Sequence, residues 1–358
     1  MQWTTWSFLP IVKQDDKVRI LGPFPPPFGG VALHCVRLLE GLRKAGIDAR
    51  GVSLGGIPYG VNHVEKMGVG FALSRTLVHY HTDEGNHRWM RLFSRIWRTT
   101  RTPYVVTVHS FRDRPEFADA RVRAQLAAAY THAAAVIGIS NEVISDLEQR
   151  LGVYHKRTRI IPSALPMSAW EMNAPLPTAL PTQWQQASVR ILANAGRVVR
   201  YNGEDLYGID VLIKAMQQIP DRDVAVCIAV GDVVDVELWR NLQHAAAQDS
   251  RVTILQQPAS PLAPVVRDAH IIVRPTRTEG GASLTVQEAL ELGRWAIASD
   301  AVPRPDGTRL FHNSDADHLA SILLSSIHDV RRGRMPPAMA PHSDAVQRII
   351  NLYERVLV

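Results

Sequence analysis

The sequence predicts an α/β protein made of two domains, each with a parallel sheet between layers of helices. Short apolar runs of strand length alternate with amphipathic helical stretches, which is the pattern of such folds. The alternation stops in a proline-rich stretch and then starts again. A chain of 358 residues is also long for a single core. We therefore expect domains at 1–165 and 189–340, a linker at 166–188, and a C-terminal helix at 341–358 that packs back on the first domain.

The expected elements follow the chain in order. Strands of the first domain are expected at Val18–Leu21, Ala49–Leu54, Leu77–His81, Tyr104–His109, Ala135–Ile139 and Arg159–Ile161. Strands of the second are expected at Arg190–Ala195, Val224–Val230, Val252–Leu255, Ala269–Val273 and Trp295–Ala298. The intervening helices include Val31–Ala45, Glu142–Leu151, Gly208–Gln218, Val236–Gln248 and Ala282–Leu292, with a last one at Ser343–Leu357. Ligands of open parallel sheets bind at the carboxyl ends of the strands, so we expect a cleft between the domains.

Composition excludes several classes of protein. No apolar run approaches the roughly 20 residues that a membrane span needs. The N-terminus lacks the pattern of a secretion signal, so a cytoplasmic protein is expected. Cys35 and Cys227 lie in apolar patterns in different halves and favour buried thiols over a disulfide.

Positive charge is concentrated in the first half of the chain. Residues 1–180 hold 22 Lys and Arg against 14 Asp and Glu, whereas the rest holds 18 against 20. The segment 89–98 adds a basic amphipathic helix. Two interpretations stay open: this helix lies on an anionic membrane at the inner face of the plasma membrane, or it packs on its own sheet. No nucleic-acid-binding motif accompanies the charge.

Two sets of residues in the first half follow predicted strands. Gly29 and Gly30 come after the first strand and directly before a helix, where a phosphate can approach backbone N–H groups. A purely structural turn explains the pair about as well. His79, His81 and the pair His109-Ser110 lie at strand ends, which favours a binding site. Zinc is a competing interpretation, but no Cys cluster or helical His motif supports it.

The second half carries a more specific pattern. Arg197 follows a strand and could clamp a diphosphate, with Arg200 nearby to share the task. Residues 271–300 predict a strand, a loop with Glu279, a helix opened by Ser283 and Leu284, and another strand. Helix N–H groups bind phosphate, while glutamates accept hydrogen bonds from sugar hydroxyls. The combination indicates a nucleotide-sugar, contacted by Glu279, Gly280, Gly281, Ala282, Ser283, Leu284 and Glu288.

Together these residues resemble the retaining glycosyltransferases of the GT-B fold, in particular glycosyltransferase family 4. The resemblance covers nearly the whole chain. It rests on the glycine loop after the first strand, Thr107–Ser110 (TVHS), Gly138–Asn141 (GISN), Ala195–Arg197 (AGR), Gly231-Asp232 (GD) and Glu279–Leu290 (EGGASLTVQEAL). The last segment is the most specific.

The resemblance implies a function and a role for each site residue. Gly29, Gly30 and Arg197 would bind the donor phosphates, Glu279 with the amides after it the transferred sugar, and Glu288 the ribose. His109 would lie near the reacting sugar, and His79, His81 and Ser110 would contact the acceptor. The implied protein is a retaining enzyme that uses a UDP- or GDP-sugar to build a surface glycan or glycolipid. No metal or other cofactor is expected, and Asp221-Arg222-Asp223 is interpreted as a turn.

Three departures from the family pattern accompany the resemblance. Eight residues, not seven, separate Glu279 from Glu288. The family's lysine before a glycine is replaced at Tyr207-Gly208, where Arg200 could supply the charge instead. The asparagine common after the strand that ends at Ile161 is absent. A nucleotide-sugar epimerase or hydrolase on the same fold, and a non-catalytic nucleotide-sugar-binding protein, remain alternatives.

Overall fold

The computed structural model describes a chain that divides into two compact units. It describes residues 18–26, 28–55, 60–68, 71, 76–82, 87–111, 115–163, 165–256, 261–279, 283–339 and 344–357. Unit 1 takes its described residues from 1–24, 35–162 and 343–358, and unit 2 from 25–34 and 163–342. The units differ from the expected domains in two respects: the predicted linker, 166–188, belongs to unit 2, and so do residues 25–34, which include Gly29 and Gly30.

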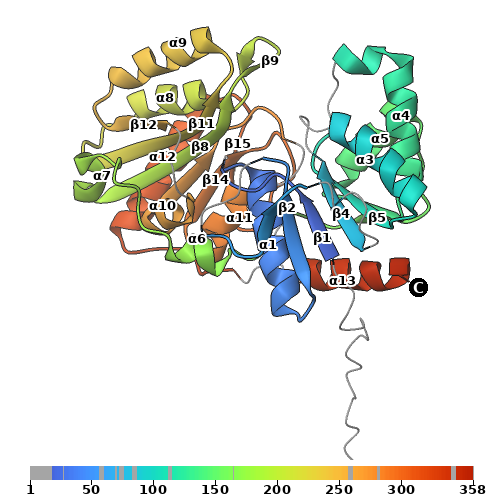
Figure 1. Ribbon diagram of the computed structural model, residues 1–358. Helices are drawn as coiled ribbons and strands as arrows, with labels where there is room; N and C mark the ends of the chain where they lie inside the picture. Colours follow the sequence, from blue (N-terminus) through green and yellow to red (C-terminus); the bar gives the residue numbers. More distant parts are fainter. Residues whose placement is uncertain are drawn as a thin grey trace, which may run out of the picture. The chain divides into compact units, whose positions relative to one another are not determined.

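Unit 1 is built on one parallel sheet (Figure 1). Its order is β3 (Val64–Lys66), β2 (Ala49–Ser53), β1 (Val18–Gly22), β4 (Leu77–Thr82), β5 (Tyr104–Val108), β6 (Ala135–Gly138) and β7 (Thr158–Ile160). The helices are α1 (Gly30–Lys44), α3 (His87–Thr100), the short 3-10 helix η1 (Pro115–Ala118), α4 (Ala120–Thr131), α5 (Asn141–Leu151) and α13 (Asp344–Leu357). All six strand pairings in this sheet are parallel, as the α/β pattern predicts.

The GISN segment of unit 1 is a strand-to-helix turn. Gly138 ends β6, and a Cβ there would lie 2.3 Å from Cγ1 of Ile144, so only glycine fits. The Ser140 side chain accepts a hydrogen bond from the Val143 amide and caps α5. Gly152 then ends α5 with φ of +64°. These residues of the family-like segment therefore position a helix.

Unit 2 repeats the same plan. Its sheet has the order β12 (Val252–Gln256), β11 (Val224–Val233), β8 (Val189–Val198), β13 (Ile271–Arg274), β14 (Trp295–Ser299) and β15 (Arg309–Phe311), all parallel. A separate antiparallel pair joins β9 (Arg200–Tyr201) to β10 (Glu204–Asp205). The helices are α6 (Ala169–Asn173), α7 (Thr182–Gln186), α8 (Ile209–Gln217), α9 (Val236–Ala247), α10 (Ala263–Asp268), α11 (Leu284–Glu291) and α12 (Ala316–Arg331).

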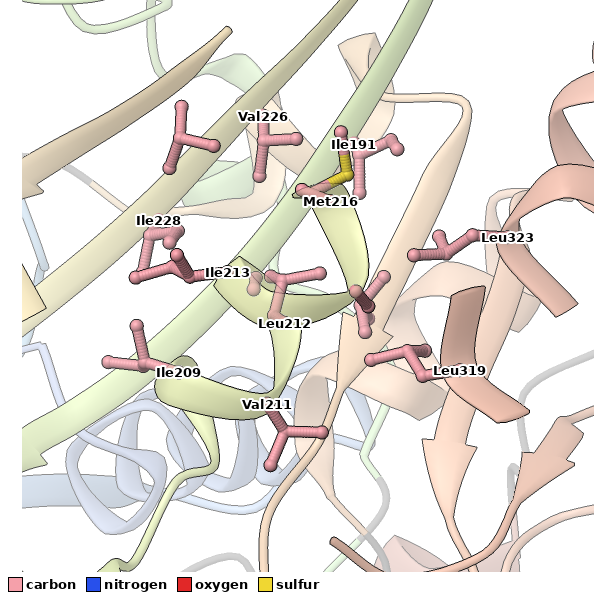
Figure 2. Packing of buried hydrophobic residues seen from close by; sticks show 14 of the residues in the cluster. Ile191, Ile209, Val211, Leu212, Ile213, Met216, Val226, Ile228, Leu319 and Leu323 are labelled. Atoms are coloured by element: carbon pink, nitrogen blue, oxygen red, sulfur yellow. The ribbon is translucent and has the colours of Figure 1, made fainter. Parts of the chain in front are cut away.

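Alternating side chains of the unit 2 strands enter two different cores. Ile191, Val226 and Ile228 face the cluster that α8, α9 and α12 complete, and Figure 2 shows Leu212, Met216, Leu319 and Leu323 packed there. Their sequence neighbours, among them Leu192, Cys227 and Ile272, face a second cluster with α7, α10 and α11. A strand covered on both faces must be apolar at nearly every position, which explains the continuous apolar runs in the sequence.

Several elements differ from the expectation. The predicted linker forms α6 and α7, and its Trp184 is buried, with the indole N–H donating to Asp268 at 2.7 Å. The sequence pattern also missed β3, β9, β10, β15 and α12. Four of these are strands of only two or three residues, too short for an alternation to be seen.

Both sheets have the strand order of doubly wound nucleotide-binding folds. In each, the order reverses beside the first strand of the unit, between β1 and β4 and between β8 and β13. Ligands of such sheets bind at the carboxyl ends of the strands flanking that reversal. In unit 1 these strands are β1 and β4, with β5 next to β4, and in unit 2 they are β8 and β13.

Candidate functional site

The centre of the candidate site in unit 2 is the carboxylate of Glu279, which two arginines hold. The Nε of Arg274 donates to Oε1 at 2.8 Å, and a second nitrogen of the same guanidinium also contacts Oε1. Arg304 forms an ion pair with Oε2. The side chains of Arg304, Arg274 and Glu279 are 1%, 10% and 11% exposed. We call these three residues the Arg–Glu–Arg cluster; it carries a net charge of +1.

Arg274 is fixed on three sides. Besides Glu279, its guanidinium donates to the backbone oxygen of Asn194 at 2.9 Å, and it lies 4.9 Å from the ring centre of Tyr207. Burial is the largest single effect on the pKa of Arg274 and lowers it, but the charges and hydrogen bonds of Glu279 and Tyr207 together outweigh burial, and the pKa is raised. Tyr207 stands where the resemblance led us to expect a lysine. The positively charged guanidinium of Arg274, from β13, thus lies over the Tyr207 ring at the position of the expected lysine.

Arg304 joins the cluster from the segment that follows β14, whereas Glu279 lies in the segment that follows β13. The Nε of Arg304 donates to the backbone oxygen of Ser299 at 3.0 Å. Neither Arg274 nor Arg304 was predicted from the sequence as a site residue. Arg274 carried a signal, since an arginine closing a buried strand needs a counter-charge. Arg304, between two prolines, carried none that a single sequence reveals.

Helix α11 begins directly after the candidate phosphate loop. Ser283 is the N-cap residue but makes no side-chain capping bond, and Leu284 is the first helical residue. Glu288 is 4% exposed and lies on the buried side of the helix rather than facing solvent. Gly280, Gly281 and Ala282 lie outside the described residues.

The two arginines expected to bind diphosphate have different surroundings. Arg197 lies within β8, which extends to Val198, and its side chain is exposed. Arg200 forms an ion pair with Asp235, the N-cap of α9, at 2.8 Å, and lies 3.7 Å from Glu237. Because Asp235 already neutralises Arg200, the contacts do not favour Arg200 as the replacement for the missing lysine. Arg197 keeps its predicted role, which remains untested.

Glycines at the strand ends of unit 2 allow neighbouring backbone segments to approach closely. A Cβ on Gly208, which has φ of +66°, would lie 1.9 Å from the backbone oxygen of Pro275. A Cβ on Gly231 would lie 2.4 Å from the backbone oxygen of Gly196. The close approach of β11 to β8 thus explains the glycine of the family-like GD segment, whereas a Cβ on Gly196 of the AGR segment would lie 3.1 Å from the Tyr207 hydroxyl.

In unit 1, His79 is engaged inside the protein. It is fully buried, with Nδ1 2.5 Å from the hydroxyl of Tyr353 and Nε2 2.7 Å from Oγ1 of Thr107. A neutral imidazole has one N–H and one lone pair, so one of these hydroxyls donates and the other accepts. Both ring nitrogens serve to hold α13 and β5, which conflicts with the prediction that His79 binds an acceptor.

His81 and His109 contact each other at the ends of β4 and β5. Nδ1 of His81 lies 3.1 Å from Nε2 of His109, and both residues are buried, with His109 8% exposed. The His79 and His81 rings lie 4.3 Å apart. Ser110 follows at the surface and is partly exposed. The structure therefore groups these histidines, as the strand-end positions predicted, while their chemical roles remain predictions.

The glycine pair after β1 lies at the start of a helix. Gly30 is the first residue of α1, and a Cβ on Gly29 or Gly30 would meet no atom within 4 Å. Packing therefore does not explain why glycine occurs at either position. This open space is compatible with the predicted approach of a phosphate.

The basic helix of the sequence analysis is α3, and it packs inside unit 1. His87, Met90, Phe93, Ser94 and Trp97 are buried, while Leu92 is 45% exposed. Most of the predicted apolar face is thus used by the core, which leaves the membrane interpretation without that face. Among the described residues, no helix is both long and apolar enough to cross a bilayer.

The carboxylates of Asp221-Arg222-Asp223 are engaged in structural contacts. Asp221 forms an ion pair with Arg331, and Asp223 accepts from the Ser188 amide at 3.1 Å. Both cysteines are buried, and neither forms a disulfide with the other.

Comparisons with solved structures show the fold. The protein is similar to HepE from Anabaena in complex with UDP-glucose, at 15% identity and a TM-score of 0.66, covering 95% of this chain and 98% of the other. It is similar to the catalytic domain of starch synthase IV from Arabidopsis thaliana bound to ADP and acarbose, at 12% identity and a TM-score of 0.64, covering 95% of this chain and 94% of the other. It is also similar to WaaG, a glycosyltransferase involved in lipopolysaccharide biosynthesis, at 12% identity and a TM-score of 0.60, covering 94% of this chain and 99% of the other. No curated protein sequence matches.

The architecture is that of the GT-B glycosyltransferases, with two parallel α/β sheets. Two family matches lie in different halves of the chain: residues 71–168 match Glycosyltransferase Family 4, and residues 190–329 match Glycosyl transferases group 1. The chain belongs to glycosyltransferase family 4, the group 1 glycosyl transferases, and is a nucleotide-sugar-dependent glycosyltransferase. The second match includes the Arg–Glu–Arg cluster and α11.

Proposed function

We propose that this glycosyltransferase moves a sugar from a UDP- or GDP-sugar, with retention of the anomeric configuration, to a glycan or lipid-linked acceptor of a surface polysaccharide. The observation that carries the proposal is the arrangement after β13. There Arg274 and Glu279 of the Arg–Glu–Arg cluster precede the N-terminus of α11, and Glu288 lies on the buried side of that helix. Cations and helix N–H groups suit a diphosphate, and carboxylates suit sugar hydroxyls.

Each residue of unit 2 takes one role in this proposal. Arg197, Ser283 and Leu284 bind the diphosphate, together with Gly280, Gly281 and Ala282. Glu279 accepts a hydrogen bond from a hydroxyl of the transferred sugar. Three guanidinium nitrogens already contact its two oxygens, so the lone pair left on Oε2 is available to the ligand. Glu288 accepts from the ribose.

The proposed reaction relies on stabilising the leaving group. The bond from the anomeric carbon to the diphosphate oxygen breaks, and the negative charge that develops is met by Arg197 and the N-terminus of α11. The acceptor hydroxyl forms the new bond on the face that the diphosphate leaves. Its proton passes to a diphosphate oxygen. His109 at the end of β5 contributes from unit 1 by contacting the reacting sugar, while Ser110, His81, Gly29 and Gly30 contribute to the acceptor and phosphate contacts.

Ligand-induced stabilisation tests the donor. A ligand at 100 times its Kd should raise the free energy of unfolding by about 2.7 kcal/mol. We expect a rise in melting temperature with UDP or GDP and the corresponding sugars, and a smaller one with ADP. No shift with any nucleotide would refute the donor site.

Two conservative variants test the glutamate roles. Glu288→Gln should weaken nucleotide binding by roughly tenfold, because a hydrogen bond to a charged group is lost. Glu279→Gln should lower kcat with little change in the Kd for nucleotide. Glu237→Gln is the matched control, since its side chain is 79% exposed on α9. Wild-type kinetics in both site variants would overturn the assigned roles.

An acceptor panel separates transfer from donor hydrolysis. Donor turnover should depend on an added glycan or lipid-linked acceptor, and the product should keep the anomeric configuration of the donor. Equal turnover with and without acceptor would instead indicate the hydrolase alternative.

A further inference from the structure

Unit 1 carries a pocket on the surface between α3 and α4. It measures about 280 Å³, several times the roughly 30 Å³ that one water molecule occupies in the liquid. Its lining includes small residues, among them the buried Ser94, the half-buried Ala128 and the exposed Ala124. Its rim carries Arg95 and Arg98 from α3, Arg121 from α4, and His132 directly after α4.

The rim arginines have no role in the core. Helix α3 buries the opposite side, where Phe93 and Trp97 pack under the sheet. Arg95, Arg98 and Arg121 are all exposed. Over the described part of the chain, no carboxylate forms an ion pair with any of the three. Three like charges gathered around one pocket repel one another, and a bound anion would remove that cost.

The other polar groups near the pocket are held by hydrogen bonds within the protein. Gln125 is neutral and accepts from Arg91 at 3.2 Å. Asp119 caps α4 by accepting from the backbone amide of Arg121 at 2.7 Å. Beneath the pocket, Tyr104 donates to the Ala129 carbonyl at 2.5 Å, and burial raises its pKa, so its hydroxyl stays neutral. Nδ1 of His132 lies 2.7 Å from the Ala128 carbonyl, which can only accept, so this nitrogen carries a proton.

We propose that this pocket binds a phosphoryl group. Guanidinium groups are planar forks whose N–H bonds match two oxygens of a phosphate at once, and three of them converge here. The small side chains of Ser94 and Ala128 in the lining let the phosphate approach the helices, while the arginines contact it from the rim. The phosphoryl group comes either from an anionic lipid headgroup or from a soluble phosphate. The pocket is lined by residues of unit 1 and the donor residues belong to unit 2, so this proposal can fail without affecting the proposed function.

Two binding assays on the full-length protein test the pocket and distinguish the sources. One measures sedimentation with phosphatidylcholine vesicles, with and without an anionic phospholipid; the other measures the Kd for inorganic pyrophosphate by calorimetry. We expect binding in at least one assay. The double variant Arg98→Ala/Arg121→Ala should weaken it roughly 30-fold, in line with the contribution of arginines near an anionic surface. Only binding that this double variant weakens is assigned to the pocket, because pyrophosphate also suits the proposed diphosphate site of unit 2. Vesicle binding weakened in this way assigns a lipid headgroup, and pyrophosphate binding weakened in this way assigns a soluble phosphate.

A matched control separates the pocket from general charge. Arg50→Ala/Arg157→Ala removes the same charge from two exposed positions of unit 1 that lie outside the pocket. It should weaken binding no more than about threefold, as expected for long-range attraction that salt screens. The proposal is overturned if the wild-type protein binds neither ligand, or if both double variants weaken binding equally. All four arginines are exposed, so unchanged melting temperatures should show that the variants fold.

Discussion

At the scale of single residues, Glu279 has two functions that are hard to separate. It is the proposed sugar contact, and it is also the only carboxylate paired with Arg274 and Arg304 in the described chain. Removing a partner from a buried ion pair costs more than the pair contributes, because a charge stays buried without compensation. An activity loss in an alanine variant at this position would therefore not identify a catalytic role.

We expect Glu279→Ala to lower the free energy of unfolding by about 3 to 5 kcal/mol, because two buried guanidinium groups lose their counter-charge. Urea unfolding measures the change. The control is Asp221→Ala, which breaks a pair whose side chains are 23% and 41% exposed and should cost less than about 1 kcal/mol. Equal losses in the two variants would show that the cluster is not a stabilising unit.

The two thiols should be unreactive in the folded protein. Burial raises the pKa of Cys227 to about 12, and Cys35 is fully buried. The thiolate is the reactive form, and for Cys227 it is scarce until the pH approaches that raised pKa. At pH 8 we expect no labelling by a thiol reagent in native buffer and two labelled cysteines in denaturant. Fast labelling of the native protein would contradict the described burial.

The sequence identified the residues of the candidate site better than their partners. Glu279, Glu288 and Arg197 were recognisable because they lie in motifs beside strand ends. Arg304 was not, because it joins the cluster only through folding, 25 residues after Glu279. His79 was assigned to a ligand because a strand-end position does not reveal that Tyr353, 274 residues later, occupies its nitrogen.

At the scale of elements, the start of α8 depends on a single glycine. Gly208→Ala places a Cβ 1.9 Å from the Pro275 oxygen, and its φ of +66° is also unfavourable for alanine. Gly203→Ala is the matched control, since Gly203 has φ of +84° and open space around its Cα. The control should cost about 1 to 2 kcal/mol from the backbone alone, and Gly208→Ala clearly more. Thermal unfolding compares them, and equal costs would exclude the clash.

Helix α13 is joined to β4 by one polar contact. Tyr353→Phe removes the hydroxyl that lies 2.5 Å from Nδ1 of His79 and should cost about 1 to 3 kcal/mol, because both groups are buried. Tyr154→Phe, at a position 77% exposed, should change the melting temperature little. An unchanged stability of Tyr353→Phe would mean that this hydrogen bond does not contribute to holding the helix.

Elements with long, strong patterns were predicted well, and short ones were not. The strands that build both sheets were recognisable because burial on two faces makes them apolar throughout. The β9–β10 hairpin escaped notice although Asn202-Gly203, with φ of 50° and 84°, is a typical hairpin turn. Proline in the stretch 166–188 concealed α6, whose Ser168 and Glu171 form a capping box.

At the scale of the whole molecule, unit 1 depends on residues from both ends of the sequence. Its sheet is complete by Ile160, but α13 buries Ile349, Ile350 and Tyr353 within the same unit. We expect deletion of residues 344–358 to destabilise unit 1 selectively. Hydrogen exchange should rise in β1 and β4 while β11 stays protected. Unchanged exchange in unit 1, or an equal rise in both units, would contradict this dependence.

The same arrangement sets an order of events during synthesis. The ribosome makes the sheet of unit 1 first, then the 180 residues Ser163–His342, and only then the helix that closes unit 1. At about 5 to 20 residues per second this interval lasts roughly 10 to 40 seconds. Throughout it, the surface that α13 later covers remains without its helix. The nascent chain therefore depends on unit 2 folding without pairing with that apolar surface, which makes this interval the most aggregation-prone stage in the life of the protein.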